Sequence, residues 1–172
     1  MLKPVHEPYN GPVSYPISAT LTALATAQAR NDGATDLNQP YGSGDSLGFV
    51  AGQICKLTNE SGTTVIDLPS SVNDDPIGIL AGGFTDSLKS GYTSFYLLSV
   101  GGIFKVKGCY DVGQSYSVGT KLTFIGTGTN AGKLTPASVY GSQPIVARVI
   151  EAPTSAANDD EMVIEILYQV EV

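Results

Sequence analysis

The sequence has few of the residues on which catalytic and metal sites depend. Of its 172 residues one is histidine, two are cysteine and none is tryptophan. A Ser-His-Asp or Cys-His nucleophile needs an imidazole held in the folded body, and a histidine-rich zinc or iron site needs several. The single histidine, His6, lies instead in a proline-rich stretch at the start of the sequence. We therefore expect no enzyme activity, no metal ion and no cofactor, and the sequence points to a structural or binding role.

Basic residues are also scarce and scattered. Nine Lys and Arg stand against 16 Asp and Glu, which gives a net charge of −7. Nucleic-acid binding depends on clustered positive charge, so we expect no nucleic-acid partner. No run approaches the roughly 18 apolar residues of a membrane-spanning helix. The first eight residues also lack the apolar segment of a secretory signal, so we expect neither a membrane partner nor export.

The two cysteines, Cys55 and Cys109, are far apart and lie in or beside predicted strands. They have no CxxC spacing, and without an export signal the sequence favours reduced, packed thiols over a disulfide.

One glycine-rich segment partly matches the sequence motif of a phosphate-binding loop. Gly126 and Gly132 are followed by Lys133, but five residues separate the glycines and Leu134 follows the lysine. The phosphate loop needs four intervening residues and then Lys-Ser or Lys-Thr. We interpret this segment as a turn.

Acidic residues cluster at Asp74-Asp75 and at Asp159-Asp160-Glu161. Paired carboxylates are used in glycoside hydrolysis, and carboxylate oxygens bind Ca²⁺. Both clusters adjoin the start of a predicted strand, where turn chemistry alone favours aspartate. A solvated turn is the favoured interpretation, with hydrolase and Ca²⁺ sites as alternatives.

Glycine and proline are abundant, and they separate short β-rich runs at regular spacing. About nine short strands in this pattern predict an all-β fold, a single β-barrel or β-sandwich. The clearest segment is 92–108, in which Gly101-Gly102 divides two such runs and predicts a tight hairpin. Alternation places Phe104 and Val106 on one face. The other strands are expected in 53–57, 63–68, 77–84, 120–125, 133–135, 145–151 and 161–172.

Residues 1–44 are expected to form an extended N-terminal arm, and residues 45–172 the β-domain. Four prolines in the first 16 residues disfavour a compact element. Residues 17–30 alternate apolar and polar side chains, which favours a strand that could lie along another subunit's sheet edge. Their alanine content, with Leu21 and Leu24 at helical spacing, leaves a helix as the alternative.

Several segments together suggest a family. They are SLGFVAGQICKLTN, DDPIGILAGGF, SVGGIFKVKG, SVGTKLTFIGTGTNAGKLTP and PIVARVIEAP, followed by EMVIEILYQVEV. In the order of its strands and turns, the stretch 45–172 resembles the β-rich decoration, or cement, proteins of tailed-bacteriophage capsids.

The resemblance implies a β-tulip-like domain that is made in the host cytoplasm and binds the outer surface of the virion. It implies the major capsid protein as partner and a dimer or trimer as the working form. The candidate contacts with the capsid or a neighbouring subunit are Pro4, Tyr9, Tyr15, Ile17, Leu21 and Leu24.

A second function comes from the nine tyrosines, which accompany loops rich in Gly, Ser and Thr. Tyrosine stacks on sugar rings, so a tail- or fibre-associated carbohydrate-binding module is the alternative, with Tyr92, Tyr96 and Tyr116 as candidates. The same composition also suits tyrosines in the core or at the rim of a β-sandwich.

Overall fold

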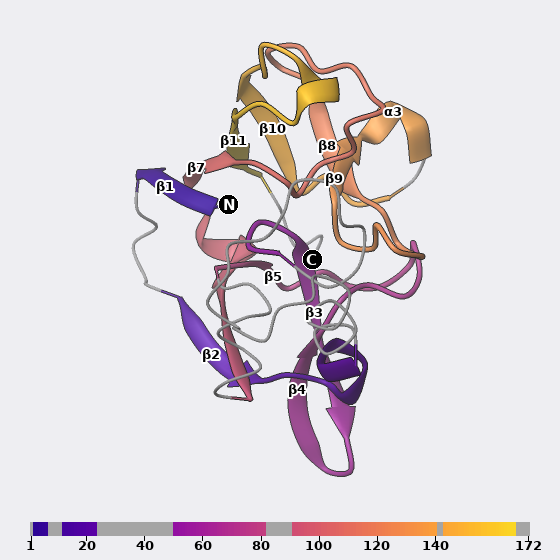
Figure 1. Cartoon of the computed structure of the whole chain (residues 1–172). Helices are drawn as coiled ribbons and strands as arrows, with labels where there is room; N and C mark the ends of the chain where they lie inside the picture. Colours follow the sequence, from indigo (N-terminus) through magenta and orange to yellow (C-terminus); the bar gives the residue numbers. More distant parts are fainter. Residues whose placement is uncertain (1, 7–11, 24–49, 82–90, 141–142, 168–172) are drawn as a thin grey trace, which may run out of the picture.

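The computed structural model describes residues 2–6, 12–23, 50–81, 91–140 and 143–167 of the chain. These residues form two antiparallel sheets with very little helix (Figure 1). The all-β class expected from the sequence is therefore confirmed.

The first sheet has six strands and lies in the upper half of Figure 1. Across the sheet they are β1 (Leu2–His6), β7 (Ile103–Val106), β11 (Met162–Ile166), β10 (Ala147–Glu151), β8 (Lys121–Phe124) and β9 (Leu134–Pro136). A short helix, α3 (Ala137–Tyr140), follows β9, and a 3₁₀ turn, η2 (Ala156–Asn158), lies between β10 and β11.

The second sheet has five strands and curls into a half-barrel. Across the sheet they are β2 (Val13–Pro16), β6 (Tyr92–Leu97), β5 (Gly78–Leu80), β3 (Ile54–Glu60) and β4 (Thr63–Asp67). A parallel bridge from Ile17 to Ile66 brings the chain after β2 against β4, at the opposite end of the strand order. The curl therefore brings the two ends of this sheet together.

The expected hairpin over residues 92–108 is wrong. β6 belongs to the five-stranded sheet and β7 to the six-stranded sheet, and a 3₁₀ turn, η1 (Leu98–Val100), lies between them. The backbone N–H of Leu98 donates to the carbonyl of Ile77, whereas the carbonyl of Gly102 accepts from Ile166. The glycine pair does supply positive φ, 68° at Gly101 and 133° at Gly102, but it turns the chain from one sheet into the other.

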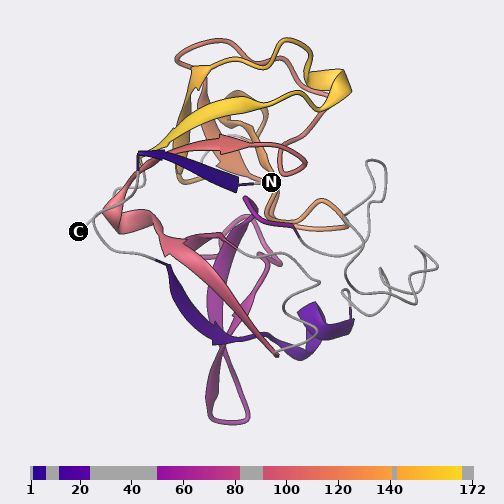
Figure 2. The same cartoon turned by 60° about the vertical axis from the view of Figure 1, so that its left-hand side comes forward.

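The first two strands also pass from one sheet to the other. They run antiparallel to β7 and β6. β1 pairs with β7, with Leu2 opposite Val106, and β2 pairs with β6, with Val13 opposite Phe95. Figure 2 shows β1 beside β7 and β2 beside β6. Residues from the start of the chain thus line the edges of both sheets.

The strand favoured for residues 17–30 is also wrong over its described part. Residues 19–23 are helical, and residues 24–30 lie outside the described part. Ser18 begins the helix because its hydroxyl accepts from the backbone N–H of Leu21, which satisfies one of the donors that a helix start leaves open. The alternation of apolar and polar residues did not prevent a helix from forming at residues 19–23, because alanine is the best helix former.

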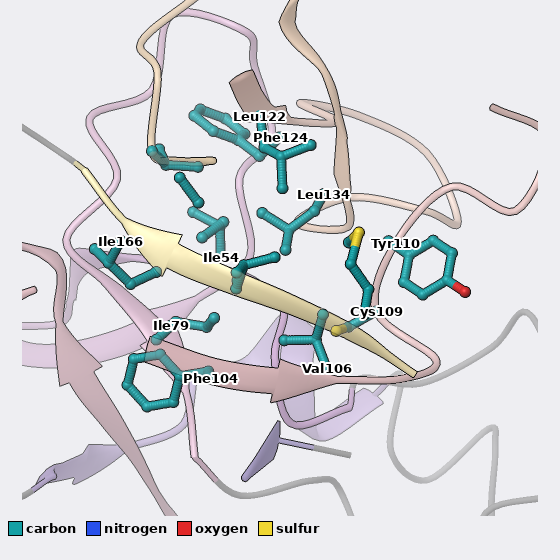
Figure 3. Close-up of a cluster of buried hydrophobic side chains, with 14 of the residues drawn as sticks. Ile54, Ile79, Phe104, Val106, Cys109, Tyr110, Leu122, Phe124, Leu134 and Ile166 are labelled. Atoms are coloured by element: carbon teal, nitrogen blue, oxygen red, sulfur yellow. The ribbon is translucent and has the colours of Figure 1, made fainter. Parts of the chain in front are cut away.

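The core of the described residues consists of two buried clusters. The larger one lies between the sheets, where Ile54 and Ile79 of the half-barrel meet Phe104 and Ile164 of the six-stranded sheet. Figure 3 shows side chains of this cluster around Ile54. The smaller one fills the half-barrel, where Leu21 packs with other apolar side chains. The smaller cluster consists of Leu21, Cys55, Ile66, Leu68, Leu80, Phe95 and Ala131.

These clusters explain the sequence pattern of the strands. β5 is buried throughout because it has one cluster on each face, which accounts for its uninterrupted apolar run. In β7 the buried residues are Phe104 and Val106, and in β11 Met162 and Ile164 face the core, as alternation predicts.

Candidate functional site

The best-defined polar arrangement in the N-terminal region is the attachment of residues 18–22 to the β3–β4 hairpin. The Ser18 hydroxyl accepts from the Leu21 N–H at 2.9 Å and donates to Asp67 Oδ1 at 2.9 Å. The Glu60 carboxylate accepts from the backbone N–H of Ala19, at 3.0 Å to Oε2. We call Ser18, Glu60 and Asp67 the anchor, because they fix the start of the helix on the half-barrel.

The anchor is partly shielded from water, and this affects Asp67. Burial raises the pKa of Asp67 above its ordinary value, against the opposing effect of hydrogen bonds from Ser18 and the Leu68 N–H. Lys56 also acts to lower this pKa, and Glu60 to raise it. The carboxylate therefore serves the fold as a hydrogen-bond acceptor at some electrostatic cost.

The β2 strand attaches the next part of the N-terminal region. The hydroxyls of Ser14 and Ser94 lie 2.6 Å apart across the β2–β6 pair. The rings of Tyr15 and Phe95 are tilted against each other with centroids 6.0 Å apart. Val13, Tyr15 and Ile17 are partly buried against the smaller cluster, so β2 contributes to the wall of the half-barrel.

The structure places the six candidate contact residues in different environments. Leu21 is fully buried in the smaller cluster, and Tyr15 and Ile17 pack against it. Pro4 lies in β1 at the position opposite Phe104. Tyr9 and Leu24 lie outside the described residues. In this structure, three of the six therefore meet the chain's own core.

Asp74, in the first acidic cluster, organises a turn. Its Oδ2 accepts from the backbone N–H groups of Ser70 and Ser71 and lies 2.9 Å from Lys56 Nζ. Burial acts to raise the pKa of Asp74, but the hydrogen bonds from Lys56, Ser70 and Ser71 outweigh it and lower the pKa. Turn chemistry, the favoured interpretation, accounts for these contacts.

The second acidic cluster closes another turn. Asp159 has left-handed backbone geometry, with φ of 53°, and its Oδ1 accepts from the Gly108 N–H. Asp160 accepts from the Ser155 N–H through Oδ2, and its carbonyl accepts from the Tyr110 hydroxyl. The Asp159 carboxylate and the Asp160 carbonyl therefore tie the loop before β11 to the loop after β7.

Most of the candidate sugar-stacking tyrosines are packed. Tyr96 lies against Phe104, and Tyr116 meets Tyr110 edge-on with centroids 5.3 Å apart. The Tyr116 hydroxyl donates to the Asp111 carbonyl, and burial raises the pKa of this tyrosine. Tyr92, 54% exposed, is the most accessible of the three candidates.

The glycine-rich loop before β9 is a turn that joins the two sheets. Its last glycine, Gly132, has φ of 79°, and its carbonyl accepts from the Ile54 N–H at 2.7 Å. A Cβ at this glycine would meet the Ile54 carbonyl oxygen at 2.5 Å. The glycine is therefore required by close backbone approach between β3 and the loop before β9.

Both cysteines are buried and unpaired, as expected. Among the described residues, no group of three or more His, Cys, Asp and Glu side chains is placed to hold a metal ion. The part of the chain that the structure describes also contains no helix long and apolar enough to cross a membrane.

The anchor was not predicted from the sequence. A signal for Ser18 was present, since serine is a preferred N-cap residue and stands directly before an alanine- and leucine-containing run. No local signal identifies Glu60 as the partner of Ala19 or Asp67 as the partner of Ser18, because they lie 41 or more residues away.

The chain matches no protein-family model and no curated protein.

Proposed function

We propose that this chain is a capsid decoration protein of a tailed bacteriophage, which binds the outer surface of the assembled head and stabilises it by bridging capsid subunits. The observation that carries the proposal is the resemblance in strand and turn order over residues 45–172. On this proposal the domain is β-tulip-like, its partner is the major capsid protein, and it acts as a dimer or trimer without catalysis.

Features of the described residues are consistent with such a role. A bridging protein needs a rigid body, and here the larger buried cluster and the hydrogen bond between Gly132 and Ile54 join the two sheets. Many weak attachments on a shell raise avidity without any single strong site. The net charge of −7 would keep free copies soluble before they attach.

Imaging of phage heads tests this proposal. Heads from a host that expresses the gene are compared with heads from a deletion strain, to which purified protein is then added back. We expect extra density on the outer surface when the protein is present, and its return after add-back. Heads with identical surfaces in all three samples would refute the proposal.

The exposed Tyr92 favours a second candidate, a carbohydrate-binding module of a tail or fibre. A solvent-facing aromatic ring is the kind of group that stacks on sugars. A glycan array with the native protein and the Tyr92→Ala variant tests it, with Tyr96→Ala as a control for a packed ring. Binding that is lost only in Tyr92→Ala supports this candidate, and the absence of any bound glycan rules it out.

A further inference from the structure

The N-terminal region is attached to both sheets. Ser18 and Leu21 are fully buried, and β2 has partly buried side chains on the smaller cluster. At the other end, β1 pairs with β7 alone among the described strands, and Leu2 packs against the larger cluster. β1 is therefore an edge strand, held along one side by its backbone pairing with β7.

The register of β1 limits the strength of this pairing. Lys3 lies directly opposite Lys105 in the register of the β1–β7 pair. The register also shifts between Pro4 and His6, which interrupts the ladder. Separation of β1 from β7 of the same chain therefore costs less free energy than separation of a strand with an uninterrupted ladder.

The same features protect the outer edge of β1. A lysine, a proline and a bulge are devices that prevent a further strand from adding to a sheet edge. The six-stranded sheet therefore accepts a strand at β7 and ends there.

The sequence around β1 also keeps it extended when it is not paired. Prolines occur at positions 4, 8, 12 and 16, and each restricts its predecessor to extended geometry. Such a segment does not fold back compactly, and every copy of the chain presents an identical acceptor in β7.

From these observations we propose that β1 is exchanged between copies of this chain, so that Leu2–His6 of one molecule pairs with β7 of a second. The contacts made in the exchanged form are those seen within one chain, so local concentration decides between them. The intramolecular pairing holds in dilute solution, and the exchanged pairing grows as copies are brought together. This proposal does not depend on binding to a capsid.

Isotope-resolved cross-linking of the unmodified protein tests the exchange. Equal amounts of unlabelled and ¹⁵N-labelled protein are mixed, incubated over a range of concentrations and treated with an amine-reactive cross-linker. Links between Lys3 and Lys105, which are backbone partners, are then identified by mass spectrometry. A link between two chains carries both isotopes, whereas a link within one chain carries a single isotope.

We expect the mixed-isotope fraction of Lys3–Lys105 links to rise with concentration towards about one half, the statistical limit for full exchange in an equal mixture. Links between Lys105 and Lys107 serve as the control within one chain, and Lys3–Lys121 links measure random encounters. Lys3–Lys105 links that stay single-isotope at every concentration, or mixed links no more frequent than the random background, would overturn the exchange. That result would leave the decoration function standing, because heads can gain density without strand exchange.

Discussion

The Ser18 hydroxyl connects two elements that are far apart in the sequence. It accepts from the Leu21 N–H and donates to Asp67, so one side chain both caps the helix and joins it to β4. This arrangement places Leu21 in the half-barrel, where it is fully buried. The anchor therefore fixes the N-terminal region to the half-barrel in addition to the pairing of β2 with β6.

Replacement of the cap tests this arrangement. Ser18→Ala removes an N-cap and leaves Asp67 without one of its donors, so we expect a loss of about 1–2 kcal/mol in the free energy of unfolding. Urea denaturation followed by circular dichroism measures it. Ser14→Ala is the matched control, because the Ser14–Ser94 contact is exposed and its loss should cost at most about 0.5 kcal/mol. Equal losses in the two variants would contradict the role of the cap.

Two aspartates should give opposite dependences of stability on pH. The pKa of Asp74 is lowered by folding, so its contribution is present above the ordinary aspartate pKa and is lost as the pH falls through the lowered value. The pKa of Asp67 is raised by folding, so ionisation of Asp67 destabilises the fold as the pH rises through the raised value.

The variants Asp74→Asn and Asp67→Asn separate these effects in urea titrations between about pH 3 and pH 7. Relative to the native protein, Asp74→Asn should become less stable as the pH rises, by about 1–3 kcal/mol in total, because charged hydrogen bonds are lost. Asp67→Asn should become relatively more stable over the same range, since asparagine keeps an acceptor for Ser18 without the charge. Parallel pH profiles for both variants would show that the carboxylates do not act as described.

The two thiols should be unreactive until the protein unfolds. Burial raises the pKa of Cys109 to about 12 and raises the pKa of Cys55 as well, so almost no thiolate is present at pH 8. A chromogenic disulfide reagent should therefore react slowly with the native protein, and its rate should rise along the urea unfolding curve. The Ser14→Cys variant, with a thiol at an exposed position, provides the positive control. Rapid labelling of the native protein would contradict the burial of the cysteines.

Two glycine substitutions should distinguish the cost of a positive φ from the cost of a clash between the added Cβ and neighbouring atoms. Gly132 and Gly62 both have positive φ, 79° and 85°, so alanine at either should cost about 1–2 kcal/mol. At Gly132 the added Cβ would also meet the Ile54 carbonyl, whereas at Gly62 nothing lies within 4 Å. We expect Gly132→Ala to lower the melting temperature clearly more than Gly62→Ala. Equal shifts in melting temperature would contradict this prediction, because they would show that β3 and the loop before β9 move apart at little cost in free energy.

Much of the fold could be predicted, because the positions of strands and turns are encoded locally. The turn after β3 is an example: Ser61 and Gly62 both have positive φ, as a two-residue hairpin requires. The burial of Phe104 and Val106 follows in the same way from alternation along a strand. The turn chemistry of Asp74 was also expected, because aspartate readily accepts from nearby backbone N–H groups.

Strand pairing and the anchor could not be predicted, because they depend on distant residues. A glycine pair between two β-rich runs suits a hairpin and a sheet-to-sheet crossing equally well, and the packing of Leu98 in the larger cluster accompanies the crossing. Residues 17–30 had competing strand and helix patterns. In the described part, residues 19–23 are helical, and the start of this helix is held by bonds from Ser18 to Asp67 on β4 and from the Ala19 N–H to Glu60 on β3.

The sequence by itself determined the all-β class, most strand positions and the faces that strands bury, since these follow from local periodicity and turn residues. Only the tertiary structure decided that β6 and β7 lie in different sheets and that β1 and β2 follow them along both edges. The physical reason is that alternation specifies which face of a strand is buried. The backbone N–H and C=O groups at the edges of a strand are the same for every sequence, so they do not specify which strand lies beside it. The choice of neighbour is made by the packing of the whole chain.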